Sequence, residues 1–509
     1  MTELLTSAQM RCIETAAIAS GKVTGGALME LAGRGVVDAV FAEWPELAAT
    51  SYRAVVLCGP GGNGGDGYVV ARLLKEWGWK VQVFALAPAA APDCIEMLAR
   101  WEGPVKPLSE LDWPDLEEAP LVVDAMFGTG LARDIAPGVW GALAMAQSRR
   151  CRIVAVDILS GLCADSGRVR SADFIDWPAD LTVTFQRPRV GHHLGQGAEL
   201  SGRLRVVPLG LDRALDDLLR SEGEQVVDLT TAQPGLLAKR SGHKFTHGHA
   251  LILSGGVGRG GAARMAARGA LRIGSGVVTL GCPPAAVIEN AAQLNAVMLR
   301  RLADAAELAE VLGDRRINAL CLGPGLGVPR AKAMLAVALT AGRAVVLDAD
   351  ALTALAEEPE LFALLHPACV MTPHDGEFAR LFPDLAARLA EPAVRGPAYS
   401  KVDATRAAAM RAGCVVLSKG ADTVIADPSG RCAINSAHFD RAVPWLATAG
   451  SGDVLAGFIT GLLSRGFAPM QAAETAAWLH VECARSFGPG LIAEDLPDAL
   501  PKVFRELAL

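Results

Sequence analysis

The sequence predicts two α/β domains, each built on a mainly parallel β-sheet covered by helices. Short apolar runs that end in Gly or Asp alternate with Ala- and Leu-rich helical patterns along nearly all of the 509 residues, as is typical of parallel sheets buried between helices. A chain of this length is too long to fold around a single hydrophobic core, because domains usually contain about 100–200 residues. The composition, 51% hydrophobic and 20% charged, is that of a well-packed globular protein.

Apolar runs in the first half predict the strands of one doubly wound sheet. Each run ends where a ligand loop would begin, at the carboxyl edge of the sheet. A helix is predicted over 67–78, directly after a Gly-rich loop. The predicted strands lie within 53–61, 80–88, 119–128, 151–161 and 179–188.

The pattern becomes charged and polar over 211–225, and we place the domain boundary there. A second series of strand-like runs follows, and neither half repeats the other at a fixed period. The two halves are therefore predicted to be separate folds rather than a duplication. The second series lies within 249–258, 276–283, 317–327, 343–352, 368–377 and 414–427.

Charge and targeting signals narrow the class of partner. The net charge is -7 and the sequence has no Lys/Arg-rich run. It therefore predicts no basic surface for nucleic acid or for an anionic membrane. Glu3, Arg11 and Glu14 interrupt the N-terminal apolar residues, so no secretory signal is predicted, and no apolar run is long enough to span a bilayer. We expect a cytoplasmic homo-oligomer that binds small molecules. The scattered cysteines, without a CxxC pair, are expected to be free thiols in the core.

The loop 59–67, GPGGNGGDG, contains the Gly-x-Gly-x-x-Gly pattern of a dinucleotide site. The acidic residue expected about 20 residues later is missing, because the next strand runs into Ala and Pro. Asn63 and Asp66 fit poorly with a pyrophosphate cradle, since a carboxylate there repels phosphate. The loop favours cation coordination or hydroxyl recognition and argues against a dehydrogenase.

Oxygen-bearing side chains follow two further strands of the first half. Asp124 ends the third predicted strand, and Asp157 and Ser160 follow the fourth. Hard cations take such oxygen ligands. Each Asp alone would fit a helix cap or a turn equally well, but together, facing one Gly-rich loop, they favour a site.

The segments 59–72, 122–135 and 154–162 resemble the three signature segments of the NAD(P)HX epimerase family, the YjeF N-terminal domain. The resemblance implies a Rossmann-like three-layer domain over 1–213, with K⁺ bound by Asn63, Asp124 and Ser160. Gly62 and Leu159 stand where the family usually has Asn and Pro, and neither change removes a cation ligand. The implied contacts of the hydrated nicotinamide nucleotide are Gly62, Asn63, Gly64, Gly65, Asp66, Gly128, Thr129, Gly130, Leu131, Ala132, Arg133, Asp134 and Asp157.

Asp157 is the candidate catalytic residue of this domain. Carbon 6 of hydrated NAD(P)H bears a hydroxyl and the ring nitrogen, so its configuration inverts by reversible loss of one substituent. One partly buried carboxylate near that hydroxyl suffices as the acid and base. In the alternative, Asp157 only orients the ribose or the substrate.

The second Gly-rich loop, AGSGDVLAGFITG over 449–461, precedes a helical pattern. Gly450 and Gly452 place backbone N–H groups at the positive end of that helix, which is an anion site for phosphate. Asp453 stands in the first turn, where a carboxylate is favourable in any protein. Lys419 follows a strand, and His374 lies in a loop before a helix. A single histidine in a loop more often has a structural role, but other loops that could bind a ligand lie beside His374, and they favour a role in a binding site.

The segments 253–276, 322–327, 346–352, 372–381, 417–426 and 447–457 resemble the ADP-dependent NAD(P)HX dehydratase family, the YjeF C-terminal domain. The resemblance implies a ribokinase-like α/β domain over 225–509. Asp375 stands where the family commonly has Pro, and Gly260 and Gly261 occupy a loop that usually carries an aromatic residue. The implied ADP contacts are Lys419, Gly420, Ala421, Asp422, Thr423 and Gly452, and the implied contacts of the hydrated nucleotide are Ala262, Gly325, His374 and Asp453.

Together the two resemblances imply a bifunctional enzyme of nicotinamide nucleotide repair. It would epimerise R- and S-NAD(P)HX and dehydrate S-NAD(P)HX to NAD(P)H with ADP, giving AMP and phosphate. Asp453 would activate the hydroxyl of the hydrate, and Mg²⁺ is inferred from the phosphoryl transfer. The alternative is a ribokinase-like sugar or vitamin kinase with a non-catalytic N-terminal binding module.

Overall fold

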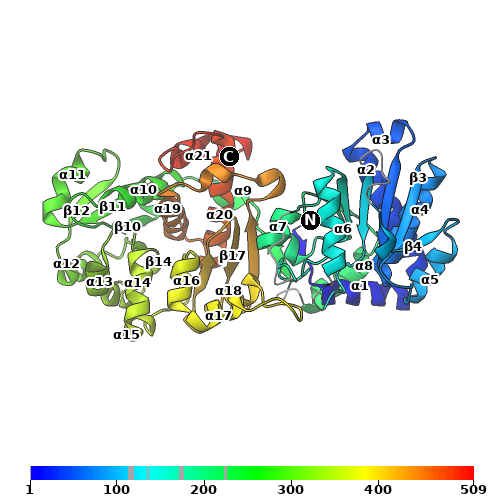
Figure 1. Cartoon of the computed structure of the whole chain (residues 1–509). Helices are drawn as coiled ribbons and strands as arrows, with labels where there is room; N and C mark the ends of the chain where they lie inside the picture. Colours follow the sequence, from blue (N-terminus) through cyan, green and yellow to red (C-terminus); the bar gives the residue numbers. More distant parts are fainter. Residues whose placement is uncertain (1, 113–119, 133–134, 136, 171–176, 223–225) are drawn as a thin grey trace. The chain divides into compact units, whose positions relative to one another are not determined.

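The computed structural model (Figure 1) contains two compact α/β units and describes residues 2–112, 120–132, 135, 137–170, 177–222 and 226–509. Unit 1 comprises residues 3–227 and 391–400, and unit 2 comprises residue 2 with 228–390 and 401–509. The chain therefore returns to unit 1 once after it has entered unit 2. Two α/β units with parallel sheets confirm the predicted fold class.

Unit 1 is built on a 7-stranded sheet in the order β4-β3-β2-β5-β6-β7-β8, in which all neighbouring strands are parallel. The predicted strands of the first half are confirmed, whereas the edge strands β4 and β8 were missed because neither has a buried residue. The strands are β2 (Arg53–Cys58), β3 (Lys80–Ala85), β4 (Val105–Pro107), β5 (Leu121–Ala125), β6 (Arg152–Val156), β7 (Leu181–Phe185) and β8 (Arg203–Val207).

Helices contribute to two separate apolar clusters of unit 1. One cluster contains buried residues of α1, α2, α4, α5 and α8, and the other contains buried residues of α6. The order of the sheet reverses between β2 and β5, and such switch points are where open α/β sheets bind ligands. The helices are α1 (Ser7–Ala19), α2 (Gly25–Glu43), α4 (Gly62–Glu76), α5 (Pro92–Ala99), α6 (Pro137–Ser148) and α8 (Asp212–Glu222).

Unit 2 contains most of an 11-stranded sheet, whose full order is β1-β9-β18-β17-β16-β15-β14-β13-β10-β11-β12. The strands from β10 to β16 pair in parallel, and β16, β17 and β18 pair antiparallel. The predicted run 414–427 thus forms a hairpin whose turn carries Lys419. The strands are β1 (Glu3–Leu4), β9 (Val227–Leu229), β10 (His249–Leu253), β11 (Val277–Cys282), β12 (Met298–Arg301), β13 (Ala319–Leu322), β14 (Ala344–Leu347), β15 (Cys369–Met371), β16 (Val415–Ser418), β17 (Asp422–Ala426) and β18 (Cys432–Ser436).

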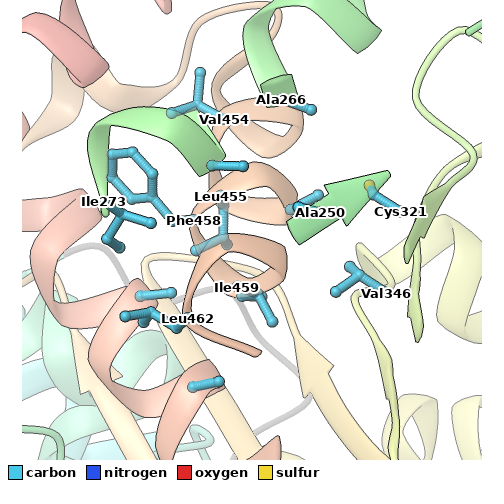
Figure 2. Packing of buried hydrophobic residues seen from close by; sticks show 14 of the residues in the cluster. Ala250, Ala266, Ile273, Cys321, Val346, Val454, Leu455, Phe458, Ile459 and Leu462 are labelled. Atoms are coloured by element: carbon cyan, nitrogen blue, oxygen red, sulfur yellow. The ribbon is translucent and has the colours of Figure 1, made fainter. Parts of the chain in front are cut away.

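The core of unit 2 fixes the helix that starts with the second Gly-rich loop, α19 (Ser451–Ser464). Figure 2 shows Phe458 and Leu462 of α19 in the apolar cluster that also contains Ile273, which directly follows α10 (Gly261–Arg272). A Cβ at Gly457 would lie 2.2 Å from the Ala266 carbonyl oxygen, so glycine permits the close approach of the two helices. The other helices that frame the sites are α13 (Val328–Thr340), α14 (Asp350–Glu357), α16 (Asp375–Leu381), α17 (Pro383–Ala390), α18 (Lys401–Ala412), α20 (Pro469–Phe487) and α21 (Asp495–Glu506).

Two further expectations concern the cysteines and the membrane. All the cysteines are free thiols, and every one except Cys12 is buried, as the sequence predicts. Among the helices that the structure describes, none combines the length and apolarity required to cross a membrane.

Candidate active sites

Unit 1 contains a cavity of about 580 Å³ at the switch point between β2 and β5. Loops after three strands and residues of α1 and α2 line it. The cavity thus brings together most residues that the sequence assigns to the first site. Those that line it are Gly62, Asn63, Asp66, Gly128, Thr129, Gly130, Leu131, Ala132 and Asp157.

Two predicted glycines of the first loop lie behind the cavity rather than in its lining. A Cβ at Gly64 would lie 1.8 Å from the Gly59 carbonyl oxygen, and one at Gly65 would lie 2.2 Å from the Met29 sulfur. Both glycines therefore permit the first turn of α4 to pack closely. The predicted contacts Arg133 and Asp134 lie outside the described residues.

The carboxylate of Asp157 has a fixed orientation toward this cavity. Its backbone has φ 64°, the left-handed region that few side chains adopt. The Thr184 hydroxyl donates to Oδ1 at 3.0 Å, and the Thr129 amide donates to Oδ2 at 3.2 Å. The Asp157 carbonyl oxygen lies 3.0 Å from Nε2 of His192. Hydrogen bonds to both the backbone and the side chain therefore fix the position of Asp157.

Charged groups around Asp157 include several that sequence reasoning missed. Burial raises the pKa of Glu14, which also lines the cavity, and the Asp157 charge raises it further. Burial likewise raises the pKa of Asp66 well above its usual range. Burial lowers the pKa of His192 to about 4, which leaves its ring neutral at pH 7. Glu14 lies in α1, too far along the sequence from the loops for spacing to reveal it.

Asp124 and Ser160 form a buried oxygen cluster beside the cavity wall. Asp124 is 0% exposed and accepts from the Ser160 hydroxyl at 2.6 Å and from the Ser160 amide at 2.7 Å. The Ser160 hydroxyl oxygen also lies 3.3 Å from the Phe127 carbonyl oxygen. Burial raises the pKa of Asp124 to about 6, although the bonds from Ser160 oppose that rise.

The first loop places Asn63 in the wall of the same cavity. Its buried Nδ2 has no hydrogen-bond partner among the residues that the structure describes. A Cβ built on Gly128 would lie 3.1 Å from Asn63 Oδ1 and 3.1 Å from Asp157 Oδ2. The carboxylate and hydroxyl oxygens of the cluster of Asp124 and Ser160, the Phe127 carbonyl oxygen and Asn63 Oδ1 are the kind of ligand that a hard cation takes.

Unit 2 contains a second cavity, of about 660 Å³, beside the N-terminal end of α19. His480 of α20 lines it and lies 2.9 Å from the Ser451 carbonyl oxygen through Nε2, and burial lowers the pKa of His480 to about 4. Sequence reasoning missed His480 because it lies in the middle of a helix. The predicted residues that line this cavity are His374, Lys419, Gly420, Ala421, Thr423 and Gly452.

Asp453 and Lys419 belong to one buried charge cluster. Lys419 Nζ contacts Asp348 Oδ1 at 2.7 Å and Glu377 Oε2 at 3.7 Å. Burial opposes the charge on Lys419, but these carboxylates outweigh it and raise the pKa of Lys419. Burial raises the pKa of Asp453 to about 7; Asp348 adds to the rise and Lys419 opposes it. Asp453 is therefore poised to exchange a proton near neutral pH.

The turn between β16 and β17 is rigid. The Thr423 hydroxyl donates to the Gly420 carbonyl oxygen at 2.7 Å and accepts from the Gly420 amide at 3.2 Å. Asp422 pairs with Lys401 at 2.7 Å, so its carboxylate supports the turn. A Cβ built on Gly452 would lie 3.6 Å from Lys419 Nζ, which places the lysine next to the start of α19.

The remaining predicted contacts come from loops on either side of the switch between β10 and β13. A Cβ built on Gly325 would lie 3.4 Å from the Ala262 side chain, so these two residues are neighbours. His374 begins α16, and its Nδ1 accepts from the Gly376 amide at 3.0 Å while its backbone amide donates to Glu377 at 2.9 Å. The side chain of His374 is 56% exposed, and its Nε2 lies 3.5 Å from Glu377 Oε1.

Comparison with known proteins identifies the family of both halves of the chain. Residues 25–191 match the family model described as YjeF-related protein N-terminus, and residues 250–502 match the model described as NAD(P)H-hydrate dehydratase. A Moorella thermoacetica protein named bifunctional NAD(P)H-hydrate repair enzyme Nnr is 35% identical over 99% of this chain and 97% of its own length. The chain belongs to the family of bifunctional NAD(P)H-hydrate repair enzymes. Both resemblances drawn from the motifs are confirmed.

Further proteins match all or part of this chain. A protein of Escherichia coli with the same name is 32% identical over 88% of this chain and 84% of its own length. A Roseobacter litoralis protein named NAD(P)H-hydrate epimerase is 41% identical and matches 42% of this chain over 100% of its own length. The solved ADP/ATP-dependent NAD(P)H-hydrate dehydratase of Bacillus subtilis, co-crystallised with ATP/Mg²⁺, is 28% identical over 54% of this chain and 94% of that chain, with a TM-score of 0.43.

Proposed function

We propose that this chain repairs hydrated nicotinamide nucleotides with one active site in each unit. Unit 1 interconverts R- and S-NAD(P)HX, and unit 2 converts S-NAD(P)HX to NAD(P)H with ADP, which becomes AMP and phosphate. The observation that carries the proposal is that each unit contains its own cavity, with Asp157 in the wall of the first and Asp453 directly after Gly452, which lines the second, in a chain that aligns with a bifunctional repair enzyme over nearly its whole length. The ranges 1–213 and 225–509 are the proposed sequence limits of the two activities.

In unit 1, Asp157 is the proposed acid and base. The two hydrogen bonds to its side chain leave the carboxylate facing the cavity. It would give a proton to the leaving substituent at carbon 6 and take one back when that substituent returns on the other face. Neutral His192 and the hydroxyl of Thr184 fix its orientation without moving protons.

We assign K⁺ to Asn63, Asp124 and Ser160, because Asp124 and Ser160 provide buried oxygens and Asn63 in the cavity wall adds an amide oxygen. A cation bound there would supply fixed positive charge beside the substrate loop. Asp124 and Ser160 bond to each other, and Ser160 also accepts from the Phe127 amide at 2.9 Å. They therefore join the ends of β5 and β6 to the segment that precedes Gly128.

In unit 2, Asp453 is the proposed base that takes the proton of the substrate hydroxyl. The hydroxyl oxygen then forms a bond to the β-phosphorus of ADP, and the bond from that phosphorus to the bridging oxygen breaks, which releases AMP. The carbon 6–oxygen bond of the phosphorylated hydrate breaks next, assisted by the ring nitrogen, and phosphate leaves. Loss of a proton from carbon 5 to the departed phosphate or to water then restores the dihydropyridine ring.

The start of α19 and Lys419 would bind the phosphates of ADP. Backbone N–H groups at a helix N-terminus bind anions, and Gly452 keeps the approach to them open because it has no side chain. Lys419 lies beside Gly452 and adds positive charge. Mg²⁺ would supply charge neutralisation for the transferring phosphoryl group. No group of three or more His, Cys, Asp or Glu side chains that could bind a metal ion occurs among the described residues, so substrate phosphates would provide most of its ligands.

The test supplies pure R-NADHX to the full-length protein, first without and then with a nucleotide. Without nucleotide, S-NADHX should form faster than it does spontaneously. With ADP, NADH, AMP and phosphate should appear in equal amounts. A stable phosphorylated alcohol in place of NADH would instead support the kinase, and a parallel assay with ATP decides the phosphoryl donor.

A further inference from the structure

A segment from the second half of the sequence packs as part of unit 1. Residues 391–400, which we name the strap, follow α17 and precede α18, yet they belong to unit 1. Ala393 and Ala398 of the strap are buried together with Cys163. Cys163 lies three residues after Ser160. The strap therefore contacts the segment that follows the candidate catalytic residue and cation ligands of the first site.

Two arginines of unit 1 anchor the strap. Arg168 and Arg170 lie at the end of a short antiparallel turn in which Leu162 pairs with Val169. The Arg170 side chain is among the largest that are fully buried, and the Ala398 amide donates to the Cys163 sulfur at 3.5 Å. The arginine bonds run from Arg168 to the carbonyl oxygens of Tyr399, at 3.4 Å, and Glu391, and from Arg170 to the carbonyl oxygen of Ala393, at 3.3 Å.

The middle of the strap reaches the substrate loop. The Gly396 amide donates to the Ala132 carbonyl oxygen at 3.2 Å. Ala132 ends the described part of the loop 128–132, which lines the cavity and donates the Thr129 amide to Asp157. A Cβ at Gly396 would lie 2.5 Å from the Ala398 amide nitrogen and 2.7 Å from the Arg170 guanidinium. Only glycine fits at this position of the strap without displacing it.

We propose that the strap is a positioning element of the first active site: Gly396 fixes the loop 128–132 in its substrate-binding position. This inference rests on the proposed epimerase function of unit 1. It makes the affinity of unit 1 for the hydrate depend on residues that the sequence places inside the second half of the chain.

The bonding pattern indicates that the strap acts on binding more than on chemistry. Asp157 has two supports outside the loop, the Thr184 hydroxyl and His192, and neither of them bonds to the strap. The described part of the loop is bonded through the Thr129 amide to Asp157, through the Leu131 amide to the Gly128 carbonyl oxygen at 3.2 Å, and through the Ala132 carbonyl oxygen to Gly396. The Roseobacter litoralis relative named as an epimerase matches only 42% of this chain, a stretch too short to contain both unit 1 up to residue 227 and a counterpart of the strap. The strap is therefore expected to set substrate affinity rather than to be essential.

The test compares Gly396→Ala with the wild-type full-length protein. Epimerisation of R-NADHX is measured without ADP, and dehydration of S-NADHX is measured with ADP. We expect the KM of epimerisation to rise about fivefold, because the loop loses one hydrogen bond. The kcat of epimerisation should stay within about twofold of the wild-type value, because the supports of Asp157 outside the loop are unchanged. Dehydratase kcat and KM should not change. Gly235→Ala is the matched control, because a Cβ there meets nothing within 4 Å.

A second pair of variants avoids any strain from the added methyl group. Arg168→Ala removes both bonds to the ends of the strap, and Arg168→Lys retains a cation that can satisfy one of them. The KM of epimerisation should rise in Arg168→Ala and recover in part in Arg168→Lys. An unchanged KM of epimerisation in both Gly396→Ala and Arg168→Ala overturns the inference. So does a fall in epimerase kcat with an equal loss of dehydratase activity, because that result indicates general misfolding. Wild-type protein that fails to epimerise R-NADHX would instead refute the proposed function.

Discussion

The two candidate catalytic carboxylates are controlled in different ways. Asp157 is fixed by hydrogen bonds, with a left-handed backbone and one donor on each carboxylate oxygen. Asp453 lies in the first turn of α19, where burial and Asp348 raise its pKa to about 7 while Lys419 opposes the rise. Proton transfer to and from the substituent that leaves and returns at carbon 6 demands a carboxylate in a fixed position. Activation of a hydroxyl for phosphoryl transfer demands a base whose proton affinity suits neutral pH.

Exchanging each carboxylate for its amide separates the two activities. Asp453→Asn should lower ADP-dependent NADH formation about 10³-fold, since the base is lost, and leave ADP binding and epimerisation intact. Asp157→Asn should lower epimerisation by a similar factor and leave dehydration of S-NADHX intact. Both rates are measured on the same full-length protein with pure epimers. Loss of both activities in either variant would contradict the assignment of one carboxylate to each site.

The pH dependence tests the charge control of Asp453. A base with its pKa raised to about 7 is ionised above that pH and protonated below it, so dehydratase kcat should rise with pH and level off above about 7, falling roughly tenfold per unit below it. Lys419 opposes the raised pKa, so Lys419→Met should move the midpoint to higher pH as well as weaken ADP binding. A profile that is flat from pH 5.5 to 8 would remove Asp453 as the base.

The hydrogen bond from Thr184 tests the geometric control of Asp157. Thr184→Val removes the donor to Oδ1, and we expect epimerase kcat to fall about fivefold to tenfold. Thr182→Val is the matched control: Thr182 is equally buried on β7, but its hydroxyl donates to the Ser201 carbonyl oxygen at 2.7 Å. A similar fall in both variants would mean that loss of β7 packing, not the orientation of Asp157, lowers the rate.

The sequence revealed local site chemistry better than long-range contacts. Asn63, Asp124, Asp157 and Lys419 follow buried strands whose apolar pattern predicts a common sheet edge, and the structure places each beside a cavity wall or its supporting cluster. Glu14 escaped detection because it comes from a helix with no motif. Such contacts depend on how distant elements pack, which periodicity does not encode.

The strap is the clearest case of this limit. Its sequence, EPAVRGPAYS over 391–400, carries turn residues such as Pro392, Gly396 and Pro397 and predicts only a loop between two helices. Its assignment to unit 1 depends on the buried guanidinium of Arg170 and on the Ala132 carbonyl group. Both partners lie more than 200 residues earlier in the chain, so local pattern could not pair them.

Cation dependence is the smallest effect we expect. It sharpens the contrast because Asp124 and Ser160 of unit 1 join a buried carboxylate to a hydroxyl group, whereas the buried carboxylate of Asp348 in unit 2 pairs with Lys419. Replacing K⁺ by tetramethylammonium, which is too large for such a cluster, should lower the Tm of the first unfolding transition by about 3 °C if K⁺ is present at roughly ten times its Kd. Ser160→Ala should remove most of this difference by removing one ligand. Ser166→Ala, a buried serine whose hydroxyl oxygen accepts from the Arg168 amide at 3.4 Å instead, should retain it. An equal K⁺ effect in the wild type and Ser160→Ala would place the cation elsewhere.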